Sequence, residues 1–205
     1  MVGVLLVSER FPREEKITMN IKIHIKHLLG WLRCLKSGVT YRGGVYIGKE
    51  VHFANGAHIK LGKNVSIRPY CDLFAGRVFE IGDNCDIGTR NRIAGNVIIG
   101  DNVLIGPDNF ICSYTHTYDN PDMPIMNQKE VPIHKNGHEE LKIGDGSWIG
   151  THVAILGDVN IGKHCVIGAN SVVTKDVPDF CVVAGIPAKV IRRYNSETQQ
   201  WETVK

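Results

Sequence analysis

A large apolar residue recurs every six positions through most of this 205-residue chain. The series shifts by two residues twice, stops after Ile111 and resumes at Ile143. A period of six fits neither the 3.6-residue turn of an α-helix nor the two-residue alternation of a single strand. The eighteen positions, in chain order, are Ile47, Phe53 and Ile59; Leu61, Ile67 and Leu73; Ile81, Ile87, Ile93, Ile99, Ile105 and Ile111; and Ile143, Ile149, Ile155, Ile161, Ile167 and Val173.

One repeat, "IGDNVL" at residues 99–104, indicates how this period specifies a fold. We expect Ile99 and Val103 to point inward. Gly100 suits a corner where a side chain would crowd the neighbouring coil, and Asp-Asn supplies polar groups that tolerate a turn. Three such strands make a coil of about 18 residues that hydrogen-bonds to the coils above and below it. The sequence therefore predicts an all-β fold, a parallel β-helix of hexapeptide repeats.

The limits of the repeat divide the chain into three parts. We expect an N-terminal arm and amphipathic helix over 1–40, the β-helix over 41–180, and a C-terminal segment over 181–205 that forms a short cap or helix. The helical spacing is carried by Ile25, Leu28, Leu29, Leu32 and Leu35, among Lys22, Lys26, Arg33 and Lys36. This stripe is expected to pack on the protein or on a neighbouring subunit, covering exposed strand edges. Peripheral contact with a membrane is the second interpretation.

Composition narrows the class of protein. A net charge of +3 does not favour a dedicated nucleic-acid binder. The apolar start "VGVLLV" lacks a small-residue cleavage site, so we expect no secretory signal. The six cysteines show neither a CxxC pair nor a zinc-ligand spacing, and three share one phase of the repeat. We therefore expect a reduced, cytoplasmic protein whose Cys71, Cys85 and Cys165 pack the core.

The break in the repeat marks a candidate functional site. His116 occupies the outward sixth position after Ile111, and the segment 117–142 that follows is too long for a simple connection. Trp148 occupies the same outward position after Ile143, so we expect the two side chains to share a corner region. A histidine is well suited to accept a proton near neutral pH, which favours a catalytic role for His116.

Other polar residues near the break have simpler interpretations. Asn91 and Asn109 occupy the inward fifth position on adjacent coils, which favours a hydrogen-bonded ladder over a substrate contact. His134 and His138 lie within the expected loop and are interpreted as solvated or facing the substrate. Asp119 and Asp122 lie close enough in sequence to orient His116.

Four motifs resemble a known group of enzymes: "SYTH" before the break, "GDGSWIGTHVAIL", "VIGANSVVTKDVP" and "VVAGIPAKVIRR". Over roughly residues 41–193 the chain is similar to the hexapeptide-repeat acyltransferases. The likeness is greatest to maltose and galactoside O-acetyltransferases and to the O-acetyltransferases of bacterial polysaccharide biosynthesis. The resemblance implies the left-handed form of the β-helix.

The resemblance also implies a mechanism. His116 matches the catalytic histidine, which would deprotonate an acceptor hydroxyl for direct attack on the thioester of acetyl-CoA. Thr151 matches the residue whose backbone N–H binds the oxyanion, a contribution of typically ~2.7–4 kcal/mol. The expected cofactor-binding residues are Trp148, Thr151, Ala169, Lys175, Lys189 and Arg192, and the expected acceptor-binding residues are Asn91, Tyr114 and Asp119. No metal is required.

One departure concerns the acceptor: Gly88 stands where sugar acetyltransferases of this group have an asparagine. The resemblance further implies a homotrimer with sites between subunits and a carbohydrate acceptor. Three alternatives remain open from the sequence. They are N-acylation of an amino-sugar nucleotide, a zinc hydro-lyase on the same scaffold, and a β-helix without catalytic activity that serves as an assembly scaffold.

Overall fold

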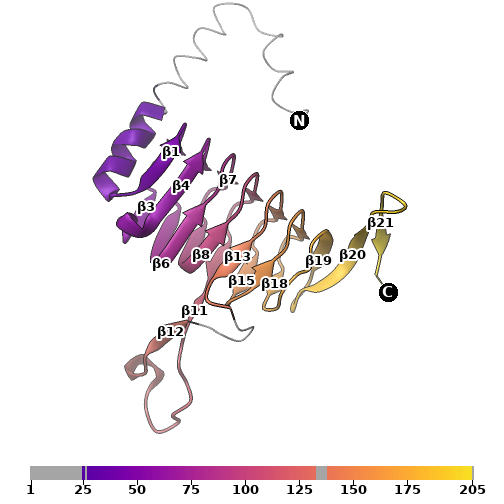
Figure 1. The fold of residues 1–205 in the computed structure, drawn as a ribbon. Coiled ribbons are helices and arrows are strands. Elements are labelled where there is room, and N and C mark those ends of the chain that lie inside the picture. The colour runs from indigo at the N-terminus through magenta and orange to yellow at the C-terminus, as the bar shows by residue number, and fades with distance from the viewer. Residues whose placement is uncertain (1–24, 26, 133–137, 205) are drawn as a thin grey trace, which may run out of the picture.

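The computed structural model describes residues 25, 27–132 and 138–204, and describes residues 130–132 by their backbone only. The fold is the predicted left-handed parallel β-helix, a stack of coils with one helix at its N-terminal end (Figure 1). The expected arm before residue 25 and the loop residue His134 lie outside the described residues.

Each coil has three sides, and strands of successive coils pair in parallel along each side. The first side contains β1 (Thr40–Gly43), β4 (Ile59–Lys63), the second halves of β6 (Asp72–Ile81) and β8 (Arg92–Ile99), β13 (Leu141–Ile143) and β16 (Asn160–Ile161). The second side contains β2 (Tyr46–Ile47), β5 (Ser66–Ile67), β7 (Asp86–Ile87), β9 (Leu104–Ile105), β14 (Trp148–Ile149), β17 (Val166–Ile167) and β19 (Cys181–Ala184). The third side contains β3 (His52–Ala54), the first halves of β6 and β8, β10 (Phe110–Cys112), β15 (Ala154–Leu156) and β18 (Val172–Val173).

The predicted core is confirmed. Seventeen of the eighteen repeat positions are buried, and the remaining one, Phe53, is partly buried against the same core. Cys71, Cys85 and Cys165 are buried beside them as predicted, and all six cysteines are free thiols. Burial raises the pKa of the Cys71 and Cys85 thiols to about 11, so these groups remain protonated.

The irregular features of the helix share one corner, where the chain passes from the third side back to the first. We call it the return corner. The two-residue shifts of the repeat fall there, at η1 (Gly56–His58) and at residues 76–78 within β6. Because of these insertions Leu61 pairs with Ile81, twenty residues later, whereas Ile81 pairs with Ile99, eighteen residues later.

The long excursion also leaves from the return corner. It contains β11 (Tyr114–His116), η2 (Ile125–Asn127) and β12 (Glu130–Pro132), and β11 and β12 pair as an antiparallel hairpin that projects from the stack (Figure 1). Since β10 ends at Cys112 and β13 begins at Leu141, the excursion spans 113–140 and begins four residues before the predicted loop at 117–142. His116 therefore lies on the hairpin and not on a coil.

The N-terminal helix, residues 27–37, covers the first coil as expected but uses a different face. Gly30 and Cys34 are buried against this coil, and the Arg33 guanidinium donates a hydrogen bond to the Ile47 carbonyl oxygen. A Cβ added at Gly30 would lie 2.5 Å from the Val45 carbonyl oxygen, so only glycine permits this approach. The predicted leucine stripe does not pack on its own chain, because the small residues on the opposite face make the contact.

The C-terminal segment extends the second side. β19 pairs in parallel with β17, and β20 (Lys189–Asn195) and β21 (Gln200–Thr203) continue the sheet antiparallel. Of the two expected forms of this segment, a short cap or a helix, the strands exclude the helix. Aromatic rings support the hairpin: Tyr194 contacts Phe180 at 6.4 Å and Trp201 at 5.5 Å between centroids.

Substitution of the two adjacent residues of β9 tests which side chains of the repeat point into the core. Ile105 is 1% exposed and Leu104 is 48% exposed. We expect Ile105→Ala to lower the free energy of unfolding by about 2–5 kcal/mol because it leaves a cavity. Leu104→Ala should change it by less than about 0.5 kcal/mol. Denaturant unfolding of both variants measures the difference, and equal effects would contradict the assigned register.

Candidate functional site

His116 is presented at the surface by a paired strand. The β11–β12 ladder places it in register with Glu130, and the Thr117 backbone N–H donates to the Lys129 carbonyl at 2.9 Å. Its imidazole is exposed and makes no hydrogen bond or ion pair with any residue in the described part of the chain. Neither Asp119 nor Asp122 orients it there. The position of His116 is thus set by the pairing of its strand, and its imidazole is accessible to a ligand.

A buried asparagine fixes the base of the hairpin. The Asn96 backbone N–H donates to Ser113 Oγ at 2.9 Å, and Asn96 Oδ1 accepts hydrogen bonds from the Arg77 backbone N–H at 2.8 Å and the Tyr114 hydroxyl at 3.4 Å. Asn96 Nδ2 donates to the Glu139 carbonyl at 3.4 Å. Asn96 therefore joins the start of the excursion at Ser113 to its end at Glu139, and Tyr114 supports the hairpin base.

A second clamp holds the end of the excursion. The His138 backbone N–H donates to the buried Asp158 at 2.9 Å, and the His138 ring lies 2.9 Å from Asp176. Asp176 also accepts the Asn160 backbone N–H at 2.8 Å. His138 is thus engaged with two carboxylates, an interaction that the sequence-based expectation did not include, while its side chain remains partly exposed. Lys175, beside Asp176, is exposed at this same corner.

The predicted asparagine ladder is confirmed. Asn91 Nδ2 donates to the Gly88 and Gly106 carbonyls at 2.7 and 2.9 Å, and Asn91 Oδ1 accepts the Asn109 backbone N–H at 2.9 Å. Asn109 Oδ1 accepts the Val153 backbone N–H at 2.7 Å in turn. Because the polar atoms of Asn91 are occupied within the core, this residue does not reach an acceptor.

Free backbone donors lie at the corner between the second and third sides, which we call the Thr151 corner. The Thr151 hydroxyl donates to the Pro107 carbonyl at 2.9 Å. The backbone N–H groups of Thr151 and Ala169 donate to no residue among those described, and the two residues lie in register on adjacent coils. Pro69 and Pro107, in the same column, have no N–H group. Thr89, in the same column, likewise has a backbone N–H without a partner among the described residues, so unpaired donors are a general feature of this corner and are accessible to solvent or to a ligand.

The predicted residues do not converge within one chain. His116 extends from the return corner, whereas Thr151 and Ala169 lie across the third side from it. Trp148 is exposed on the second side between Leu104 and Val166. The expectation that it shares a corner region with His116 is therefore wrong. The reason is that the excursion leaves from the corner opposite the second side.

The basic residues near the C-terminus divide between two places. Lys189 and Arg192 are exposed on β20, where Lys189 pairs with Ala184 and Arg192 with Val182. Since β19 pairs with β17, the end of β19 follows Ala169 along the Thr151 corner. Lys189 therefore lies near Ala169, at the C-terminal end of the Thr151 corner, whereas Lys175 lies at the return corner.

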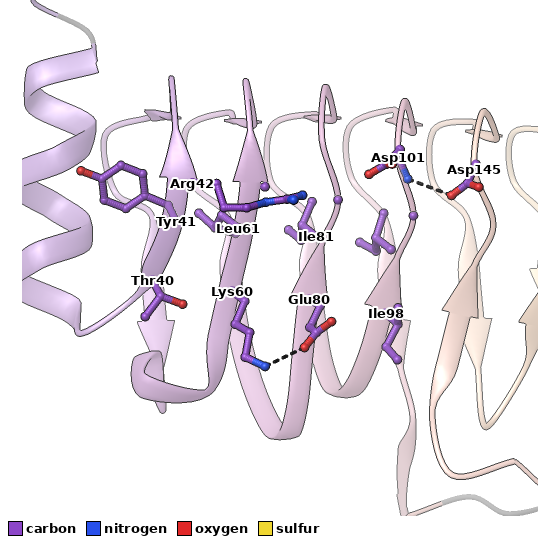
Figure 2. Close-up of a pocket in the computed structure, with 14 residues that line it drawn as sticks. Thr40, Tyr41, Arg42, Lys60, Leu61, Glu80, Ile81, Ile98, Asp101 and Asp145 are labelled. Carbon is purple, nitrogen blue, oxygen red and sulfur yellow. Dashed lines mark hydrogen bonds and ion pairs between the residues drawn. The ribbon is translucent and has the colours of Figure 1, made fainter.

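A groove of about 480 Å³ on the first side contains none of these residues (Figure 2). Within the groove Lys60 pairs with Glu80 at 2.9 Å, and Arg42 pairs at 2.5 Å with Asp83, which lies outside the lining. Asp145 accepts the Asp101 backbone N–H, and this bond together with Lys163 lowers the pKa of Asp145. These contacts join coil to coil and indicate a structural role. Within the described residues, no three His, Cys, Asp or Glu side chains gather as metal ligands.

Sequence reasoning did not identify Asn96 or the role of His138. The available signal was positional: "GN" at residues 95–96 lies at a corner, eighteen residues before Ser113 and Tyr114, where the repeat breaks. In a helix with coils of that length these residues stack. A Cβ added at Gly95 would lie 2.1 Å from Ser113 Oγ, which shows how closely the corner packs.

The Asn96 contacts predict the stability of the hairpin base. We expect Asn96→Ala to lower the free energy of unfolding by about 1–3 kcal/mol because buried donors lose their acceptor. Limited proteolysis of the excursion should accelerate at the same time. The exposed Asn160 serves as the control, since its side chain makes no hydrogen bond with a described residue. Similar urea unfolding of Asn96→Ala and Asn160→Ala would show that Asn96 does not anchor the excursion.

Comparison with known proteins identifies the family to which the chain is similar. The family model described as bacterial transferase hexapeptide (six repeats) matches residues 141–175. A protein of Escherichia coli (strain K12) named as a lipopolysaccharide biosynthesis O-acetyl transferase, WbbJ, is 33% identical over 187 residues, which cover 85% of this chain and 94% of WbbJ. The galactoside O-acetyltransferase of the same strain is 35% identical over 69% of this chain and 66% of its own length.

A solved structure shares the fold. A mutant of AntD, an N-acyltransferase from Bacillus cereus in complex with dTDP-4-amino-4,6-dideoxyglucose and coenzyme A, matches with a TM-score of 0.68. The match covers 83% of this chain and 91% of that one at 20% sequence identity. At this identity the likeness concerns the fold alone.

Proposed function

The chain belongs to the hexapeptide-repeat acyltransferases, and on that premise we propose that it is an acetyl-CoA-dependent O-acetyltransferase acting on a sugar or a surface-polysaccharide intermediate. The observation that carries the proposal is the His116 imidazole, presented on an anchored hairpin with no partner among the described residues. A general base needs such an accessible ring, because its partner is the substrate.

The proposed reaction is direct acyl transfer. His116 takes the proton of an acceptor hydroxyl while the hydroxyl oxygen attacks the thioester carbonyl carbon. The resulting oxyanion accepts a hydrogen bond from the Thr151 backbone N–H. This N–H group has no partner among the described residues, which supports its proposed role as the donor. The carbon–sulfur bond then breaks, and the CoA sulfur receives the proton from His116. The products are an acetyl ester and CoA.

We further propose that the site forms between subunits of a homotrimer. The hairpin that carries His116 leaves the stack at one edge of the third side, and Thr151 lies at the other edge. A neighbouring copy that brings its Thr151 corner to the hairpin completes the site. Closed threefold symmetry makes three equivalent sites of this kind.

The remaining proposed assignments rest on the resemblance to the family. Ala169 and Trp148 contact the pantetheine arm, and Lys175, Lys189 and Arg192 bind the CoA phosphates. The excursion, with Asp119 exposed on it, forms the acceptor wall. The name of WbbJ supports a substrate from cell-surface polysaccharide synthesis, and that of the galactoside enzyme supports a sugar hydroxyl. We place this reaction in the cytoplasm, where acetyl-CoA is available.

Removal of the base tests the mechanism. We expect His116→Ala to lower kcat by roughly 10²–10⁴-fold, since general-base catalysis contributes about that much. The Kd for acetyl-CoA, measured by calorimetry, should stay within about twofold. His52→Ala, an exposed histidine of the first coil, is the control. CoA release with free, nucleotide-linked and lipid-linked sugars, followed by mass spectrometry, gives the activity. Turnover equal to that of the unmodified protein would remove His116 from the mechanism.

Charge reversal tests whether Lys189 binds the CoA phosphates. Lys189→Glu should raise the Kd for acetyl-CoA about tenfold at low ionic strength, because a phosphate contact becomes repulsive, and the effect should shrink in salt. Lys63→Glu, an exposed lysine near the other end of the stack, should leave the Kd unchanged. If both variants bind acetyl-CoA like the parent, Lys189 lies outside the site.

A further inference from the structure

The N-terminal helix is attached to the stack by one face only. Gly30 and Cys34 are buried, and Arg33 bonds to the carbonyl of Ile47, so these contacts fix the rotation of the helix about its axis. The opposite face is consequently determined by the fold. Its side chains are exposed, and the helix lies at the end of the stack remote from the C-terminal hairpin (Figure 1).

This outward face is apolar. At about 100° per residue its large side chains cover an arc of roughly 160°. Their exposed fractions run from 43% to 66%. A contiguous patch of this kind marks an interaction site, whereas single exposed leucines do not. The patch, called here the apolar helix face, consists of Ile25, Leu28, Leu29, Trp31, Leu32 and Leu35.

The sequence segment that contains this face is basic, and acidic residues flank it at Glu15 and Glu50. Between Lys16 and Lys49 the sequence contains seven Lys or Arg and no Asp or Glu. The rest of the chain carries seventeen Lys or Arg and twenty-one Asp or Glu. The positive charge is therefore concentrated in the segment that holds the helix, while the remainder is net acidic.

We propose that the apolar helix face docks on the surface of an anionic lipid bilayer. The leucines and Trp31 enter the boundary between headgroups and acyl chains, and the exposed Lys36 on the same helix meets the lipid phosphates. A second copy of this face is the weaker occupant, because it would bring two basic segments together. No helix in the described ranges has the length and apolar character of a membrane span. The contact is thus peripheral.

Vesicle binding tests the surface without reference to acetyl transfer. The protein should sediment with vesicles of phosphatidylcholine containing about one-third phosphatidylglycerol, and much less with phosphatidylcholine alone. Raised salt should weaken the binding. Trp31 emission should shift to the blue on binding, and Trp31→Phe should remove most of that shift while binding persists.

Substitutions locate the contact. Leu28→Glu combined with Leu35→Glu should lower partitioning into the anionic vesicles at least tenfold, because two buried apolar side chains become charged. Val204→Glu, at the other end of the stack and also exposed, is the matched control. Lys36→Glu is a second variant that leaves the apolar side chains intact and should also weaken binding. Circular dichroism verifies that each variant folds.

Two results would overturn the proposal. One is equal binding of the leucine variant and the parent protein. The other is absence of binding to anionic vesicles together with self-association that the leucine variant abolishes, which would assign the face to a second copy.

Discussion

The register between successive coils is the constraint on which the rest of the structure depends. Backbone N–H groups of one coil donate to carbonyls of the next, as Gly88 does to Ile105 and Gly106 to Ile149, both at 2.8 Å. A Cβ added at Gly88 would lie 2.7 Å from the Gly106 carbonyl oxygen, so the coil spacing itself requires glycine there. A single coil cannot bury its aliphatic residues, and stability therefore belongs to the stack.

The three corners differ in how much irregularity they accept. The two regular corners are fixed by columns of residues with positive φ, such as Asn64, Asn84 and Asn102, whose side chains bond from coil to coil. The return corner has no continuous column of this kind, and its turns differ from coil to coil. Insertions are therefore tolerated there, and the excursion that carries His116 is the longest of them.

The same geometry separates the components of the candidate site. The hairpin leaves from the return corner, and the free N–H groups of Thr151 and Ala169 lie at the far edge of the third side. A rigid stack cannot bend to close this separation, and for this reason the proposed mechanism has a neighbouring subunit supply the second component. The helix on the first coil is likewise oriented by the small residues Gly30 and Cys34, and it directs its leucines outward.

The sequence by itself determined the β-helix, the identity of its inward residues, the Asn91–Asn109 ladder and the position of the break, because each depends on a spacing that is local to the chain. It did not determine which face of the helix packs, since Gly30 carries no apolar signal although its missing Cβ permits the contact. Nor did it predict that Asn96 bonds to the carbonyl of Glu139, forty-three residues later, or that His138 meets Asp176. Only the tertiary structure decided these pairs, because a long excursion has no period and its ends are located by the coils that it connects.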